Sequence, residues 1–366
     1  MSAETVTGFS PSGAANDKLP AGDTGIRRRL MESTTNPRRS DYDVTNTVQV
    51  SSPAAVRLAV SQLFANVWPH ASLTAIDRSF ARLEEMFSGQ ASGYFGVDTL
   101  YHDTQHTLDI TLAMVRLLAG YERQCEARDR LGAERAAIGL ITALFHDVGY
   151  LRESSESEIA SGAEFTRMHV SRGARFLATW LPEIGHADWV PIVSELIHYT
   201  GYEKPIASIA LADARDRRMG QLLGTADMMA QMADRCYLEK CRDRLYPEFV
   251  LGGVALPSGA DGYRKVIYAS GVDLLRQTPA FMRDVREKRL NGEFERAYRY
   301  VEILFGGRNP YIEAIDRNAA FLNEVLRSES WKMLRRNPPV FAAIHDPIGT
   351  MRGLMAGYIR KVWAEG

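Results

Sequence analysis

The stretch AAIGLITALFHDVGY, residues 136–150, decides the fold. Its first ten residues are apolar on nearly every side, which is typical of a helix buried all round. The helix predicted over residues 134–146 ends in an imidazole next to a carboxylate, His146-Asp147. Ionisable groups at the end of a buried helix need an electrostatic partner. The stretch therefore predicts a central helix that delivers two polar side chains into the protein interior.

Helical periodicity continues on both sides of this stretch. Leu108, Leu112, Val115 and Leu118 recur at spacings of three and four, whereas the alternation typical of strands is almost absent. We therefore predict an all-α helical bundle without internal repeats. The expected helices cover residues 56–67, 72–87, 100–121, 134–146, 160–181, 189–199, 219–244, 263–290, 294–305, 311–327 and 350–363.

Two changes in composition divide the chain into three parts. Residues 1–48 are rich in Ser, Thr, Gly, Asp and Pro and show no apolar periodicity, which predicts a disordered N-terminal tail. Helical periodicity is lost again between residues 246 and 262, a region that contains Pro247, Pro257 and paired glycines. We expect a metal-binding helical domain over residues 49–250 and a helical C-terminal extension over residues 251–366 that packs on the core.

Composition excludes several classes of partner. The 44 Lys and Arg residues nearly balance the 45 Asp and Glu residues, so the chain has no basic field to hold long nucleic acid. The apolar stretch over residues 136–145 is half of the roughly 20 residues that a membrane-spanning helix needs. The three cysteines form no CxxC pair, which favours a reducing compartment, and we expect a cytoplasmic protein. The chain is also a candidate to form a homo-oligomer.

Six ionisable residues lie in separate apolar segments along the middle of the chain. One such histidine or aspartate alone is usually a core residue satisfied by hydrogen bonds or by a nearby arginine. Divalent metal ions, however, neutralise many buried imidazoles and carboxylates at once. We therefore predict a metallohydrolase whose metal ligands are His106, His146, Asp147, His169, His198 and Asp227.

A seventh residue, His102, lies four positions before His106 in the segment YHDTQH. On a helix this spacing places both side chains on one face, about 5 to 6 Å apart at their Cβ atoms. One histidine can then bind metal while the other contacts a substrate. Taken alone, the pair is more typical of two surface histidines.

These residues resemble the HD-domain superfamily of metal-dependent phosphohydrolases over roughly residues 100–248. His106, His146-Asp147 and Asp227 look like the defining ligands of that helical fold. His169 and His198 lie where the two-metal branches of the superfamily place two further histidines. The resemblance implies a two-metal centre in which Asp147 bridges the ions.

The segment around His102 also resembles the YHNxxH motif of cyclic nucleotide phosphodiesterases, in which the first histidine is the proton donor. Asp103 replaces the asparagine of that motif, and Tyr150 stands where those enzymes have a second histidine. The bacterial cyclic-dinucleotide branch usually has a GYP tripeptide. The segment from Gly201 to Pro205 is only loosely similar to it. A cyclic mononucleotide, a cyclic dinucleotide and another phosphate ester therefore all remain open as substrates.

The resemblance and the ligand types together predict a mechanism. Imidazoles and carboxylates without thiolates suit two divalent ions of Mn, Fe, Mg, Zn, Co or Ni. Such ions can activate a hydroxide that attacks phosphorus, with His102 and Asp147 as catalytic residues and His102 protonating the leaving oxygen. Lys204, Arg172 and Arg235 are candidates to bind phosphate oxygens.

The predicted function is thus a phosphodiesterase acting on a nucleotide, a cyclic nucleotide or a related small phosphate ester. There are two alternatives. A diiron oxygenase of the HD superfamily would use the same ligands, whereas a non-catalytic sensor of metal or nucleotide is suggested by the helical extension after Gly262, which would signal to a partner. The substrate cavity is expected to be walled by the helices after residue 263, and candidate wall residues are Gln277, Phe281, Tyr298 and Phe305.

Overall fold

The computed structural model describes residues 38–256, 266–342 and 355–356. Within these ranges the regular structure is helical, and no β-strand is present. Two isolated β-bridges pair Tyr42 with Gln49 and Tyr94 with Glu153. The predicted all-α class is confirmed for this part of the chain.

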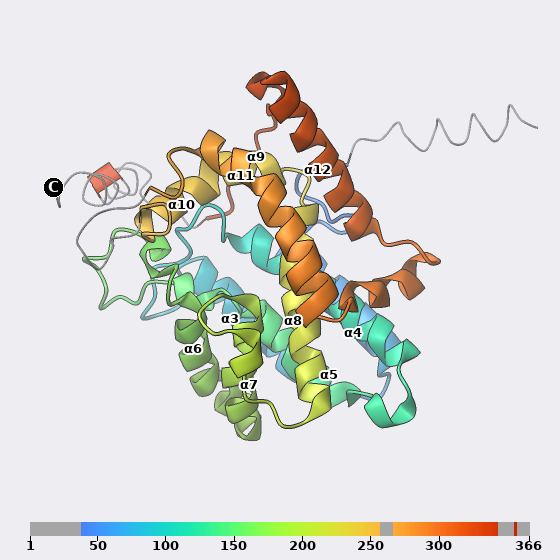
Figure 1. The fold of residues 1–366 in the computed structure, drawn as a ribbon. Coiled ribbons are helices and arrows are strands. Elements are labelled where there is room, and N and C mark those ends of the chain that lie inside the picture. The colour runs from blue at the N-terminus through green and yellow to red at the C-terminus, as the bar shows by residue number, and fades with distance from the viewer. Residues whose placement is uncertain (1–37, 257–265, 343–354, 357–366) are drawn as a thin grey trace, which may run out of the picture. The chain divides into compact units, whose positions relative to one another are not determined.

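The helices are joined by turns and by longer loops (Figure 1). The α-helices are α2 (Pro53–Val67), α3 (Thr74–Phe87), α4 (Thr104–Gln124), α5 (Gly132–Leu144), α6 (His169–Glu183), α7 (Val190–Leu196), α8 (Ala214–Ala233), α9 (Tyr237–Lys240), α10 (Tyr246–Leu251), α11 (Gly271–Asp284) and α12 (Pro310–Ser328). The 3-10 helices are η1 (Ala127–Asp129), η2 (Val148–Tyr150), η3 (Gly162–Phe165), η4 (Ala187–Trp189), η5 (Ile197–Thr200), η6 (Ile206–Ser208), η9 (Ala297–Phe305) and η10 (Trp331–Met333). Two π-helical segments are η7 (Cys241–Leu245) and η8 (Val285–Glu293).

Polar caps set where the principal helices begin. The Asp103 side chain accepts a hydrogen bond from the backbone N–H of His106 at the start of α4, and Asp213 caps α8 through Arg215 in the same way. An N-cap side chain of this kind stabilises a helix by about 1 kcal/mol. The cap at Asp103 fixes the first turn of α4, and this turn carries a predicted metal ligand.

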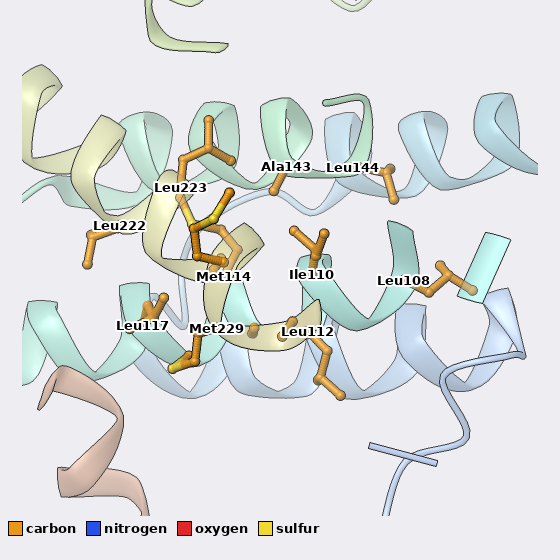
Figure 2. Packing of buried hydrophobic residues seen from close by; sticks show 14 of the residues in the cluster. Leu108, Ile110, Leu112, Met114, Leu117, Ala143, Leu144, Leu222, Leu223 and Met229 are labelled. Carbon is orange, nitrogen blue, oxygen red and sulfur yellow. The ribbon is translucent and has the colours of Figure 1, made fainter. Parts of the chain in front are cut away.

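The core is organised around α4, which is buried from Gln105 to Glu122. It packs against α2, α5 and α8, and α5 also packs against α8. Figure 2 shows the interlocked side chains of three of these helices, which come from α4 (Leu108, Ile110, Leu112, Met114 and Leu117), α5 (Ala143 and Leu144) and α8 (Leu222, Leu223 and Met229). Each fully buried leucine contributes about 1.5 to 3 kcal/mol, so these three helices form a rigid scaffold.

The C-terminal helices share this core. Helix α12 packs along α8, and η9 packs against α4. The approach of η9 is so close that a Cβ atom at Gly120 would lie 1.8 Å from the carbonyl oxygen of Tyr300. The described residues from Arg38 onward cluster as one compact unit. The described helices before and after residue 250 therefore share one continuous set of packed helices.

Several predicted boundaries differ from the structure; the helices expected from residues 100 and 160, for example, begin at Thr104 and His169. Residues 38–48, which we assigned to the tail, belong to the folded unit, because Asp43 is fully buried and bonds to Arg116 at 2.8 Å. The helix predicted over 219–244 ends at Ala233, and the region after residue 246 begins with helix α10 instead of a loop. Pro247 permits this helix because a proline fits its first turn.

Some predictions fall outside the described residues. These are the tail over residues 1–37, the loop after Leu256 and most of the helix expected over 350–363. Among the residues that the structure does describe, no helix is both long and apolar enough to cross a membrane.

Candidate metal centre and cavity

The scaffold helices bring four of the predicted ligands together. His106 lies in the first turn of α4, and Asp227 lies in the middle of α8. His146 and Asp147 follow the end of α5, where η2 begins. All four are at most 8 % exposed. The packing of α4, α5 and α8 against one another thus determines where these side chains meet.

Asp147 is the hub of the cluster. Its Oδ2 atom lies 3.0 Å from Nε2 of His146 and 3.3 Å from Nε2 of His106. Its Oδ1 atom lies 3.6 Å from Nε2 of His169. One ligand atom each of His106, His146 and Asp227 also lies within 4.8 Å of the others. A carboxylate flanked by three imidazoles in this way can hold a cation on either oxygen.

Backbone carbonyls orient two of the histidine rings. Nδ1 of His146 lies 2.8 Å from the carbonyl oxygen of Ala143, and Nδ1 of His169 lies 2.8 Å from that of Thr166. Because a carbonyl can only accept, Nδ1 carries the hydrogen in both rings. When such a ring is neutral, its Nε2 atom presents a lone pair to Asp147; when the ring is protonated, Nε2 donates to that carboxylate instead. This outer hydrogen bond is the usual arrangement of histidines that bind metals.

The buried donor atoms of the cluster have the properties that a metal site requires. His146 Nε2 and Asp147 Oδ2 are buried and have no hydrogen-bond partner in the described part of the structure. Two facing acceptors repel each other unless a positive charge lies between or beside them. The donor atoms are imidazole nitrogens and carboxylate oxygens, which suit a divalent ion of the borderline or hard class. The residues present therefore fit a bound divalent cation.

The pKa shifts of the residues in the centre also favour a bound cation. Although burial raises the pKa of Asp147, the neighbouring His146 and His106 hold it well below its usual range. Burial raises the pKa of Asp227 to about 7, and the charge of Asp147 adds to this shift. Burial lowers the pKa of His146, but Asp147 outweighs it and raises that pKa to about 9. The cluster thus attracts positive charge, which a proton or a metal ion can supply.

A fifth predicted ligand, His169, is held at the edge of this cluster by its surroundings. A Cβ atom at Gly149 would lie 1.9 Å from the carbonyl oxygen of His169, so a glycine is required where η2 meets α6. Glu203 accepts hydrogen bonds from the backbone N–H groups of Val170 and Ser171, at 2.8 and 3.1 Å. The carboxylate therefore caps the first turn of α6, which His169 begins.

The sixth predicted ligand, His198, lies apart from the cluster. It is buried in η5, and its Nδ1 atom has no hydrogen-bond partner among the described residues. The charged groups that act on it are Lys204, Glu203 and Glu195, and burial with the nearby lysine lowers its pKa. No contact described for the structure joins His198 to Asp147, so its role as a ligand stays a prediction.

His102 is paired with a residue that sequence reasoning missed. Its Nδ1 atom lies 2.6 Å from Oε2 of Glu248, whose other oxygen accepts a hydrogen bond from the Tyr101 backbone at 2.6 Å. The ring of His102 stacks on Tyr150 at 4.4 Å, and Tyr150 stacks on His169 at the same distance. Burial lowers the pKa of His102, but Glu248 outweighs it and raises that pKa above its ordinary value.

Two of the three cations proposed for phosphate are paired elsewhere, and none of the three is among the described residues that line the cavity. Arg172 donates to both oxygens of Glu156 at 2.7 and 2.9 Å and to the carbonyl of Gly149, which is a structural role. Lys204 pairs with Glu195 at 2.8 Å. None of Arg172, Lys204 and Arg235 is among the described residues that line the cavity. The arginine that does line it is Arg167, which no motif marked.

A cavity of about 440 Å³ opens above the cluster. His102, His106, Asp147, His169 and Asp227 lie on its lining. Of the four wall residues expected from the sequence, only Phe281 is in the described lining, because Gln277, Tyr298 and Phe305 bond or pack elsewhere. The remaining described walls are mainly apolar and aromatic.

Comparisons of the chain with family models, with curated proteins and with solved structures found no match.

Proposed function

We propose that the chain is a metal-dependent phosphohydrolase of the HD-domain type, most simply a phosphodiesterase that hydrolyses a small phosphate ester. One observation carries the proposal: a cluster fit for cations and a histidine paired with a carboxylate share one cavity. The cluster includes the orphaned pair His146 and Asp147, and the paired histidine is His102. A site that only stored or sensed metal would not need the second feature.

His106, His146, Asp147 and Asp227 would hold the first ion, and His169 extends the cluster on the far side of Asp147. Divalent ions bound there would supply an activated water and would stabilise negative charge on phosphoryl oxygens. The chain itself holds its ligands ready, since the rings of His146 and His169 are fixed by backbone carbonyls. Such preorganisation lowers the cost of assembling the centre.

His102 would donate a proton to the leaving oxygen. Its Nδ1 atom faces Glu248, so Nε2 is the ring atom left to face a substrate. Glu248 favours the protonated ring, because it raises the pKa of His102. Hydrolysis adds the oxygen of water to phosphorus and breaks the ester bond, and the proton from His102 neutralises the departing alkoxide. General acids of this kind accelerate a reaction by about 10² to 10⁴.

The same ligands would also serve the diiron oxygenase considered above. The pairing of His102 with Glu248 favours hydrolysis, because a proton donor beside the cavity assists a leaving group directly. Assays with and without dioxygen separate the two reactions. An oxygenase would consume dioxygen and would lose its product under anaerobic conditions.

The decisive experiment is a screen of the purified chain after loading with Mn or Fe. Substrates would include cyclic mononucleotides, cyclic dinucleotides, nucleoside phosphates and simple phosphodiesters. We expect bound metal and turnover of at least one diester. Absence of bound metal after supplementation would overturn the proposal.

A further inference from the structure

We propose that the cavity takes a phosphate ester with one negative charge and an apolar body, an alkyl or aryl group, in preference to a nucleotide. This inference rests on the proposed function, and it concerns the walls of the cavity above the metal ligands. The walls beyond the ligands are formed mainly by Tyr202, Tyr237, Leu245, Phe249, Val254 and Phe281.

Three polar side chains in the described walls, those of Gln231, Thr166 and Thr200, are already bonded to the protein. Gln231 accepts a hydrogen bond from the Tyr101 hydroxyl at 3.1 Å and donates to Asp227 at 3.2 Å. The hydroxyls of Thr166 and Thr200 each donate to the backbone carbonyl three residues earlier, at 2.7 and 2.8 Å. A nucleotide base or sugar needs several hydrogen-bonding partners to be selected. The walls offer few for that purpose.

The charges around the cavity favour a substrate with little charge of its own. Asp147, Asp227 and Glu203 contribute carboxylates to the lining. The one arginine among the described lining residues is Arg167, which is exposed and donates to the carbonyl of Gly253 at 2.5 Å, and no lysine is among them. Bound metal ions would be largely offset by these carboxylates. A polyphosphate would lack counter-charges, whereas a monoanionic diester would need none beyond the metal centre.

The apolar walls provide the binding energy for an apolar body. Phe281 is 39 % exposed and Tyr202 is 65 % exposed, so both side chains keep surface that a ligand can cover, although Arg289 lies over the Tyr202 ring at 4.5 Å. Each methylene that leaves water contributes about 0.8 kcal/mol, close to a fourfold gain in affinity. An alkyl or aryl group of moderate size should therefore bind better than a short one.

The test uses three phosphonate monoesters that carry one negative charge, and phosphorus NMR after each titration checks that their P–O ester bond is intact. They are ethyl methylphosphonate, hexyl methylphosphonate and thymidine 5′-methylphosphonate. Dissociation constants are measured by calorimetry on the full chain with Mn. We expect the hexyl ester to bind at least about tenfold more tightly than the ethyl ester and more tightly than the thymidine ester. Phe281→Ala should reduce the hexyl preference, and Leu58→Ala, at an exposed site on α2, should leave it unchanged.

Equal binding of the ethyl and hexyl esters, tightest binding of the thymidine ester, or no binding would overturn the inference. A parallel assay measures hydrolysis of p-nitrophenyl ethyl phosphate and p-nitrophenyl hexyl phosphate. A hexyl preference in binding without hydrolysis of either diester would support the cavity inference and contradict the proposed function. Hydrolysis of both diesters at equal kcat/KM, with equal phosphonate binding, would do the reverse.

Discussion

Ligands carried by long helices and ligands carried by short turns differ in how the fold places them. His106 and Asp227 lie on α4 and α8, which span 21 and 20 residues and pack directly against each other. His198 lies on η5, which has four residues, and no described contact joins it to the cluster. Positions on long, mutually packed helices are set by many apolar contacts. A position on a short turn depends on a few local bonds, and His169 lies between these extremes.

The largest effect should follow substitution of Asp147, which lies among His106, His146 and His169. Asp147→Ala deletes both carboxylate oxygens, which lie 3.0 to 3.6 Å from three imidazoles. We expect bound metal and hydrolysis both to fall to background. Metal analysis of the gel-filtered protein and an assay of diester hydrolysis measure the effect. Asp188→Ala, at an exposed site in η4, is the control and should change neither. Full metal content in Asp147→Ala would show that the hub lies elsewhere.

The next effect separates catalysis from metal binding. His102→Ala should lower kcat by about 10² to 10⁴ while metal content stays unchanged. The loss should be smaller for p-nitrophenyl esters, because nitrophenolate leaves without a proton. Parallel assays with alkyl and nitrophenyl leaving groups measure the difference. An equal loss for both kinds of leaving group would contradict a role as proton donor.

The substitution Glu248→Gln tests whether Glu248 keeps the ring of His102 protonated. Glu248 raises the pKa of His102, so its removal should lower that pKa. The protonated ring would then be lost at lower pH, and the basic limb of the kcat profile should shift toward acid. Profiles of wild type and variant over the neutral range measure the shift. A basic limb that stays in place would mean that another group supplies the proton.

The same contrast explains what could be predicted from the sequence. The candidate ligands on α4, on α8 and directly after α5 were predictable because apolar periodicity marks buried helices and polar residues stand out in them. Glu248 was not, because it follows a proline in a segment without periodicity and meets His102 across 146 residues. The position of Arg167 in the cavity and the partners of Arg172 could not be predicted either, since surface periodicity does not indicate which residues an arginine side chain contacts. The closeness of η9 and α4 depends on Gly120, whose packing partner is 180 residues away.

A direct test of the contrast compares the two outer histidines. Nε2 of His169 lies 3.6 Å from Asp147, whereas His198 has no described contact with the cluster. We expect His169→Ala to weaken metal affinity or activity at least about tenfold more than His198→Ala does. Metal titrations and kcat/KM on both variants give the comparison. Equal losses would indicate that η5 rearranges when metal binds and brings His198 into the centre.

The smallest effect should come from the residue that holds His169 in its intermediate place. Glu203 accepts hydrogen bonds from two backbone N–H groups in the first turn of α6. Glu203→Ala removes both bonds and a negative charge at a helix N-terminus, and should lower the free energy of unfolding by about 1 to 2 kcal/mol. Glu203→Gln retains an acceptor, so it should cost less. Denaturant unfolding measures both variants, with Glu183→Ala at the opposite, exposed end of α6 as control.

The two Glu203 variants also report on the centre itself. If the cap positions His169 over Asp147, activity should fall in the same order as stability, with Glu203→Ala below Glu203→Gln and both above His169→Ala. Full activity in a destabilised Glu203→Ala would separate the cap from the centre. His169 would then owe its position to the hydrogen bond from its Nδ1 atom to Thr166 and to the contact of its backbone with Gly149.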